Sequence, residues 1–142
     1  MRLLDHVSIA VRDIAAAKRF YRAALGALGA AEVYARADAI GFGERNREGD
    51  DGHSYLSVFQ APDATATPRR HWCFRAASAA MVRDFHRAGL AAGGTDAGAP
   101  GLRAYHPGYF AAFLHDPDGN KVEAVFHGGG DGADAEAPSR EG

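Results

Sequence analysis

Residues 3–11 alternate in part, with the hydrophobic Val7, Ile9 and Val11 on one side and the polar or small His6, Ser8 and Ala10 on the other. This period of two predicts a half-buried strand. The spacing becomes helical over residues 14–25, after Asp13, whose side chain can accept a hydrogen bond at a helix N-terminus. Gly26 indicates where this helix ends. The chain is therefore expected to open with a strand followed by a helix.

Three more strands are predicted before residue 61. They cover residues 32–36, 39–42 and 55–60, which are rich in β-branched, aromatic and other apolar side chains. Residues 43–54 are polar, charged and rich in glycine, so they are expected to form a loop. Residues 61–70 are interpreted as a linker.

The same order of elements returns after the linker. Residues 71–75 alternate as a strand, and Ser78 can cap a helix over residues 79–91. Three strands are expected to follow, near Leu102 to Tyr105, over Tyr109 to His115, and over Lys121 to Phe126.

A shift of 65 positions places His6 on His71 and Phe20 on Phe85. We infer a duplicated βαβββ unit, with modules at about 3–60 and 71–127 in one α+β domain of residues 1–127. Residues 128–142 contain few bulky apolar side chains and are expected to be disordered.

The last predicted strand follows a dense run of turn-forming residues, DPDGN at positions 116–120. Within that strand, Val122, Ala124 and Phe126 share one face, and Glu123 points to the other. A carboxylate in the middle of an apolar strand needs a partner, because burying it unpaired is costly.

Composition narrows the class of protein. The chain has 142 residues and a formal net charge of -2, which argues against a general nucleic-acid binder. Cys73 is the single cysteine, so an internal disulfide is excluded and a reducing compartment is indicated. No apolar run reaches the about 18 residues of a membrane span, and the N-terminus lacks a signal-peptide pattern. A cytoplasmic protein without a membrane partner is expected.

Several of these features together resemble the vicinal oxygen chelate superfamily. They are His6-Val7 in the opening strand, Phe20-Tyr21 in the first helix, and the DPDGN segment followed by Glu123. This group contains glyoxalase I, extradiol dioxygenases, epimerases, and fosfomycin- and bleomycin-resistance proteins. Segments 93–102 and 107–110 are similar to a glyoxalase/bleomycin-resistance-like subgroup. The resemblance covers residues 3–127 and implies a cupped mixed sheet around a divalent metal ion, usually in a homodimer.

Carried over residue by residue, the resemblance implies three metal ligands, His6, His71 and Glu123. The fourth ligand position of glyoxalase I is a glutamate, and the 65-residue shift maps it onto Val58. No acidic residue lies in segment 55–61, which departs from the glyoxalase I pattern. Two histidines and one carboxylate remain, the set of the dioxygenase branch, and the ion could be zinc, nickel, manganese or iron.

Such a ligand set leaves coordination positions open for two oxygens of a small substrate. The ion could polarise a carbonyl, generate hydroxide or, as iron, bind dioxygen. The alternative is that both histidines are ordinary sheet residues and that Glu123 pairs with Arg75. Cys73, on the same face, could be a thiol near the metal or a buried, inert side chain.

Four residues are candidates for binding the substrate. Arg75 and Arg103 could bind an anionic group, and Tyr109 and Phe113 could line a pocket. The alternatives are a solvated loop for Arg103 and an aromatic core for Phe113. No catalytic base can be identified.

The leading hypothesis is a metal-dependent isomerase, lyase or dioxygenase of glyoxalase-like type. A metal-free protein that sequesters a drug or metabolite in the same cup is the alternative. A scaffold without either property is the third hypothesis.

Overall fold

The structure is a computed structural model that describes residues 2–128. Its elements are, in chain order, β1 (His6–Val11), α1 (Ile14–Ala27), β2 (Glu32–Arg36), β3 (Ala39–Gly43), β4 (Tyr55–Gln60), β5 (His71–Arg75), α2 (Ala79–Ala91), β6 (Thr95–Leu102), β7 (Tyr109–His115) and β8 (Lys121–His127). None of the helices in residues 2–128 is long and apolar enough to cross a lipid bilayer. The predicted tail lies outside the described residues, apart from Gly128, whose N–H donates to the Gly108 carbonyl.

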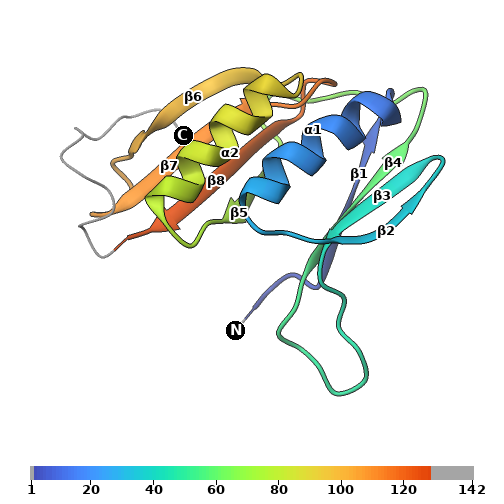
Figure 1. Cartoon of the computed structure of the whole chain (residues 1–142), viewed down its shortest axis with the longest axis horizontal. Helices are drawn as coiled ribbons and strands as arrows, with labels where there is room; N and C mark the ends of the chain where they lie inside the picture. The colour runs from blue at the N-terminus through green and yellow to red at the C-terminus, as the bar shows by residue number, and fades with distance from the viewer. Residues whose placement is uncertain (1, 129–142) are drawn as a thin grey trace.

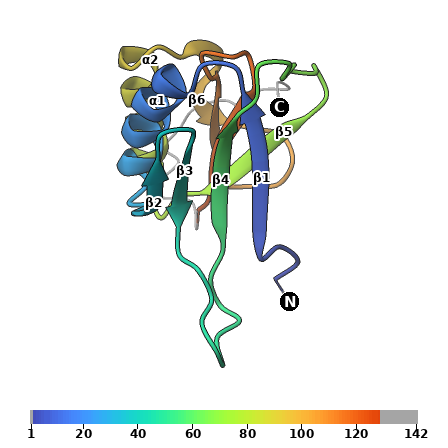
Figure 2. The same ribbon diagram turned by 90° about the vertical axis from the view of Figure 1, so that its right-hand side faces the viewer.

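Each module builds its own four-stranded sheet, in the order β1-β4-β3-β2 and β5-β8-β7-β6. In each module the strand that comes first along the chain pairs in parallel with the strand that comes last, β1 with β4 and β5 with β8. The other neighbouring strands are antiparallel. Helices α1 and α2 pack against each other in one layer in front of the sheets (Figure 1). Figure 2 shows the same layer beside β1 to β4. The predicted α+β fold of two βαβββ modules is confirmed.

The two modules share one hydrophobic core. Phe20 of α1 and Phe85 of α2, which the 65-residue shift superposes, are both fully buried in it. Gly89 allows the close approach of the elements, because a Cβ there would lie 2.4 Å from a methyl carbon of Leu114. The helices begin where predicted, since Asp13 accepts a hydrogen bond from the Ala16 N–H and Ser78 accepts one from the Met81 N–H.

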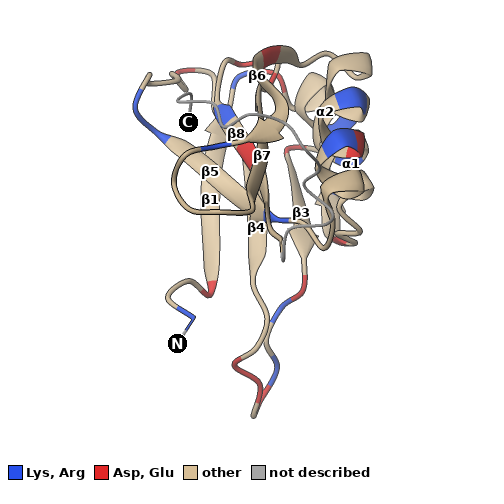
Figure 3. Cartoon of the chain, turned by 90° about the vertical axis from the view of Figure 1, so that its left-hand side faces the viewer, with Lys and Arg blue, Asp and Glu red and all other residues tan. Residues whose placement is uncertain are grey.

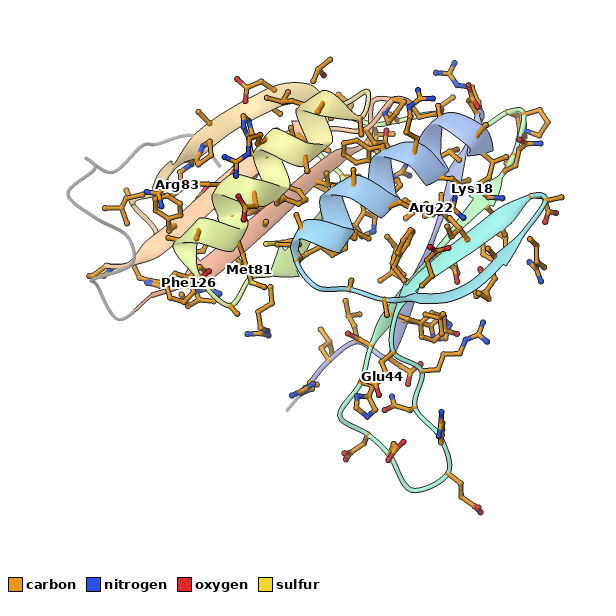
Figure 4. The ribbon with its side chains drawn as sticks, in the orientation of Figure 1. Lys18, Arg22, Glu44, Met81, Arg83 and Phe126 are labelled. Atoms are coloured by element: carbon orange, nitrogen blue, oxygen red, sulfur yellow. The ribbon has the colours of Figure 1, made fainter. Side chains whose placement is uncertain are left out.

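The outer side of α1 makes polar contacts with β2. Arg22 lies 3.2 Å from the Glu32 carboxylate, and the Lys18 ammonium donates to the Arg36 carbonyl. Both side chains project from α1 toward β2 in Figure 4. Because the Arg22–Glu32 pair is about half exposed, it adds little to stability.

The prediction of a strand near residues 102–105 is wrong. The strand is β6, and it ends at Leu102, so the glycine- and proline-containing segment 98–101 is extended. β6 is an edge strand whose pairing with β7 shifts register between Asp96 and Gly98 and again before Gly101. An edge strand with bulges tolerates proline, because the missing N–H need not face a neighbour.

The DPDGN segment does more than connect β7 to β8. Asp116 is only 3% exposed, and one of its carboxylate oxygens accepts hydrogen bonds from the N–H groups of Asp118 and Asn120. The other oxygen accepts from the Asn120 side chain at 2.9 Å and from the Tyr21 hydroxyl at 2.6 Å. Since Tyr21 lies on α1, a turn of the second module holds the helix of the first.

A second aspartate of the same turn contacts the start of α1. The Asp118 carboxylate accepts a hydrogen bond of 2.8 Å from the Arg12 N–H, and the Arg12 side chain lies 3.3 Å away. Asp116 and Asp118 therefore fix the middle of α1 and the residues just before it relative to the second sheet.

We expect Tyr21→Phe to lower the free energy of unfolding by about 1–3 kcal/mol, because it removes a donor from a buried carboxylate. Urea denaturation followed by circular dichroism measures the change. Tyr105→Phe is the matched control, since Tyr105 is 60% exposed, and its effect should be small. Equal stability of Tyr21→Phe and the native protein would contradict the role given to this hydrogen bond.

Candidate functional site

A cavity of about 710 Å³ lies where the two modules meet. His6, the first residue of β1, and His71, the first residue of β5, both line it. Cys73 and Arg75 of β5 lie along the same wall. The apolar part of the lining contains Leu25, Leu28, Phe42, Leu56, Trp72 and Phe74.

The Glu123 carboxylate lies close to His71, Tyr109 and Cys73. It lies in β8 opposite Cys73 of β5 and is only 3% exposed. His71 Nε2 is 3.1 Å from Glu123 Oε1, and the Tyr109 hydroxyl donates to Oε2 at 2.6 Å. His71 and Tyr109 therefore both contact the Glu123 carboxylate, and Arg75 lies opposite Val125 in the register.

Phe113 lies beside this cluster on the same face of the second sheet. It is opposite Glu123 in the β7–β8 register and is buried. The His71 ring is 6.1 Å from it, centroid to centroid, and the Lys121 ammonium lies 4.7 Å from its ring centroid. Phe113 thus has the core position that the alternative prediction gave it, with polar groups around its ring.

Arg103 is folded back onto its own strand. Its guanidinium is buried, lies 5.5 Å from the Phe113 centroid, and donates to the Ala99 and Gly101 carbonyls at 2.8 and 3.0 Å. Its Nε–H has no hydrogen-bond partner in the described part of the chain. Two of its five N–H donors therefore hold the bulged strand β6.

His6 is held by a chain of polar contacts. Its Nδ1 is 2.8 Å from Asp5 Oδ1, and the Asn46 side chain donates to Asp5 Oδ2 at 2.8 Å. Both hydrogen bonds lower the pKa of Asp5, so this carboxylate stays ionised at neutral pH. The His6 ring also stacks on Tyr55, with the ring centroids 4.9 Å apart. An ionised Asp5 favours a proton on Nδ1 and leaves Nε2 as the nitrogen able to accept.

Asn46 belongs to the long loop between β3 and β4. Acidic and basic residues follow one another along this loop, which extends away from the sheets in Figure 3. Asn46 also fixes the loop itself, because its side chain exchanges hydrogen bonds with the backbone N–H and carbonyl of His53. The loop thus reaches back to the histidine of β1.

The spacing of His71 and Glu123 suits a metal ion. Two ligand atoms about 2.1 Å from an ion and at right angles to each other lie about 3 Å apart, close to the 3.1 Å observed. Within residues 2–128, however, no three His, Cys, Asp or Glu side chains are grouped closely enough to hold an ion. One chain therefore supplies two of the three predicted ligands at bonding distance from each other, and His6 stands apart with Asp5.

The position of the glutamate that is the fourth ligand in glyoxalase I corresponds to Ser57 in this chain. His6 and Ser8 pair with Tyr55 and Ser57, as His71 and Cys73 pair with Lys121 and Glu123. The register therefore corrects the assignment to Val58, which is fully buried in the hydrophobic core. The simple shift of 65 failed because the whole stretch from His71 to its partner Lys121 is one residue longer than the stretch from His6 to its partner Tyr55. Ser57 is buried and accepts a hydrogen bond of 2.9 Å from the Tyr34 hydroxyl.

Three residues of the site were missed by sequence reasoning. Asp5 carried a signal, since a carboxylate next to a candidate ligand histidine is a common orienting group. Asn46 lies 41 residues from Asp5 in a loop without a periodic pattern, so nothing in the sequence indicated this contact. Lys121 was recognised only as part of a strand.

Comparison with known proteins places the chain in a broad group. A crystal structure of a glyoxalase/bleomycin resistance protein from Albidiferax ferrireducens is 29% identical, with a TM-score of 0.73, and the alignment covers 88% of this chain and 98% of that one. A family enzyme from Burkholderia phytofirmans is 23% identical, with a TM-score of 0.64 and coverage of 88% and 98%. The fosfomycin resistance protein FosX from Mesorhizobium loti is 20% identical, with a TM-score of 0.60 and coverage of 89% and 92%. The last two likenesses concern the fold alone.

No curated protein matches the chain in sequence. A family model does match, over residues 3–124, which is most of the chain. The duplicated βαβββ fold and the neighbouring structures agree with it. The chain belongs to the Glyoxalase/Bleomycin resistance protein/Dioxygenase superfamily.

Proposed function

We propose that this protein is a metal-dependent enzyme of glyoxalase-like type that acts on a small substrate through two adjacent oxygens. His71 and Glu123 of one copy and His6 of a second copy bind one divalent ion, which is zinc, nickel, manganese or iron. The observation that carries the proposal is the pair of ligand atoms, His71 Nε2 and Glu123 Oε1, 3.1 Å apart beside a cavity. The reaction class is an isomerisation, a lyase reaction or a dioxygenation.

The second copy is invoked because of where the histidines lie. β1 and β5 are edge strands, and each pairs with only one neighbour in its sheet. His6 and His71 are the first residues of these strands, at positions related by the duplication. If β1 of one copy lies beside β5 of another, His6 approaches the His71–Glu123 pair, and a two-fold axis creates two such sites. The expected assembly is a homodimer.

The bound ion would act as a Lewis acid toward the substrate oxygens. The protein's own residues prepare the ligands. Tyr109 donates to Glu123 Oε2, which leaves Oε1 directed toward His71. Asp5 holds the proton of His6 on Nδ1, so Nε2 is the atom that can bind. These contacts fix the orientation of the ligands before anything binds.

In the metal-free protein, neither Tyr109 nor Cys73 is ionised so as to act as a base. Burial and the hydrogen bond to Glu123 raise the pKa of Tyr109, so its phenol keeps its proton and acts as a donor. Burial of the thiol and the nearby Glu123 charge raise the pKa of Cys73 as well, although the residue as a whole is exposed. Both groups stay protonated at neutral pH.

A second candidate function is metal-free sequestration of a drug or metabolite. The apolar lining of the cavity of about 710 Å³, which includes Leu25, Phe42 and Trp72, favours this alternative. In that case His6 and His71 would line the cavity without binding an ion.

Native protein purified without an affinity tag or chelator should contain one transition-metal ion per chain by elemental mass spectrometry. The His6→Ala and His71→Ala variants should each lose it while keeping the native circular dichroism spectrum. A metal-free native protein that stays metal-free after incubation with zinc, nickel, manganese and iron would refute the enzyme proposal. Sequestration would then be the leading hypothesis.

The shared site can be tested by mixing two inactive variants. After joint refolding of His6→Ala and His71→Ala, half of the dimers are mixed, and each mixed dimer has one intact site. Metal content should therefore recover to about a quarter of the native value. His6→Ala mixed with Glu123→Ala should recover equally, whereas His71→Ala mixed with Glu123→Ala should not. No recovery in the first mixture would show that the ligands do not come from two copies.

Alkylation of Cys73 by iodoacetamide should be slow at pH 8, because a raised pKa leaves little thiolate at that pH. The rate should keep rising above pH 9 without a plateau, as followed by mass spectrometry. Glu123→Gln removes one cause of the raised pKa and should increase the rate at pH 8. A rate that levels off below pH 8.5, near the ordinary pKa of a thiol, would contradict this prediction.

A further inference from the structure

The face of the first sheet that turns away from the helices carries arginine side chains on aromatic rings. The Arg45 guanidinium lies 4.8 Å from the ring centroid of Tyr34 and 5.1 Å from that of Tyr55. The Arg36 guanidinium also lies over the Tyr34 ring, 5.3 Å from its centroid. We call Tyr34, Arg36, Arg45 and Tyr55 the arginine–tyrosine row. It adjoins the candidate site, because His6 stacks on Tyr55.

Tyr34 is fixed as the floor of this row. Its ring lies over Gly41 of the neighbouring strand, where a Cβ would come within 2.4 Å of the ring carbon Cε1. Any larger residue at position 41 would push the ring away. The hydroxyl donates to Ser57 at 2.9 Å, which prevents the ring from sliding along the sheet. A rigid aromatic surface therefore supports the guanidinium of Arg45.

The charge of Arg45 is not neutralised within residues 2–128. Arg36 lies 3.8 Å from the Asp38 carboxylate, whereas Arg45 forms no ion pair with a described carboxylate. Its described contacts are with the faces of two rings, which attract a cation but do not use its N–H groups. The planar fork of N–H donors is thus free to bind a carboxylate through two parallel hydrogen bonds.

We propose that Arg45, held in place by the rings of Tyr34 and Tyr55, binds the carboxylate of a small carboxylic acid. That this carboxylate site is part of the substrate site rests on the proposed function. His6 is a metal ligand in that proposal, and it stacks on Tyr55, the ring that Arg45 also contacts. Carboxylate binding by Arg45 does not depend on a metal. The substrate class that follows is a small carboxylic acid with its chelating oxygens directed toward His6.

The test uses benzoate and the full-length protein treated with a chelator. Titration followed by ¹H–¹⁵N NMR should shift the Arg45 Nε–H signal and the amides of Tyr34 and Tyr55. Arg45→Gln should weaken benzoate binding at least about tenfold, because two charge-assisted hydrogen bonds are lost. Benzamide, which has the same shape and no charge, should bind the native protein as weakly as benzoate binds the variant.

Arg47→Gln is the matched control, since it removes the same charge from the same loop, and Arg47 has no described contact with the rings. Its benzoate affinity should equal that of the native protein. Arg45→Lys should bind with intermediate affinity, because the charge remains and the fork is lost. Equal benzoate affinity of Arg45→Gln and the native protein would overturn the inference. An equal loss in Arg47→Gln and Arg45→Gln would also overturn it, because the effect would then be general electrostatic attraction.

The same variants separate this inference from the proposed function. His71→Ala should lose the metal and keep Arg45-dependent benzoate binding, and Arg45→Gln should keep the metal. If the native protein never binds a metal but benzoate binding depends on Arg45, the proposed function fails and the carboxylate site stands. If metal binding occurs and benzoate binding is independent of Arg45, only the carboxylate site fails.

Discussion

The buried carboxylate of Asp116 is the constraint on which the arrangement of the two modules depends. A nearly unexposed charge must have its hydrogen bonds supplied by the protein, since each one left unmade is costly. Three donors come from its own turn, and the fourth is the Tyr21 hydroxyl, 95 residues away. Burial and the adjacent carboxylate raise the pKa of Tyr21, so this hydroxyl remains a donor. Because the turn precedes β8, the contact that joins the modules also sets the position of Glu123.

The duplication of the βαβββ unit accounts for the two similar sheets, and differences between the two modules account for the candidate site. In both modules the first and last strands are parallel neighbours, so the position of Ser57 in one corresponds to that of Glu123 in the other. Each of these positions accepts a hydrogen bond from a tyrosine hydroxyl, Tyr34 in the first module and Tyr109 in the second. The modules therefore share a polar position on the face away from the helices, but only one of them has a charge there.

Periodicity predicted most of the elements because each is fixed locally. Strand-forming composition located β2 and β4 to the residue, alternation located β5, and the cap at Ser78 located α2. β6 was misplaced because its glycines and Pro100 belong to a bulged edge strand, a situation that local propensity does not encode. In the site, the shared face of His71 and Glu123 followed from strand alternation. The contacts of Asp5 with Asn46 and of Tyr21 with Asp116 depend on tertiary packing, and no pattern along the chain predicts them.

The position of Ser57 determines what a single substitution in the first module would do. It is a small side chain on the strand that neighbours β1, and a phenol already donates to it from Tyr34. A single replacement by glutamate would put a carboxylate at the position that corresponds to Glu123, with a hydrogen-bond donor in place to orient it. The first module therefore offers a position for a second acidic group and holds a serine there. One substitution would thus change the set of acidic and neutral groups on this face of the sheets.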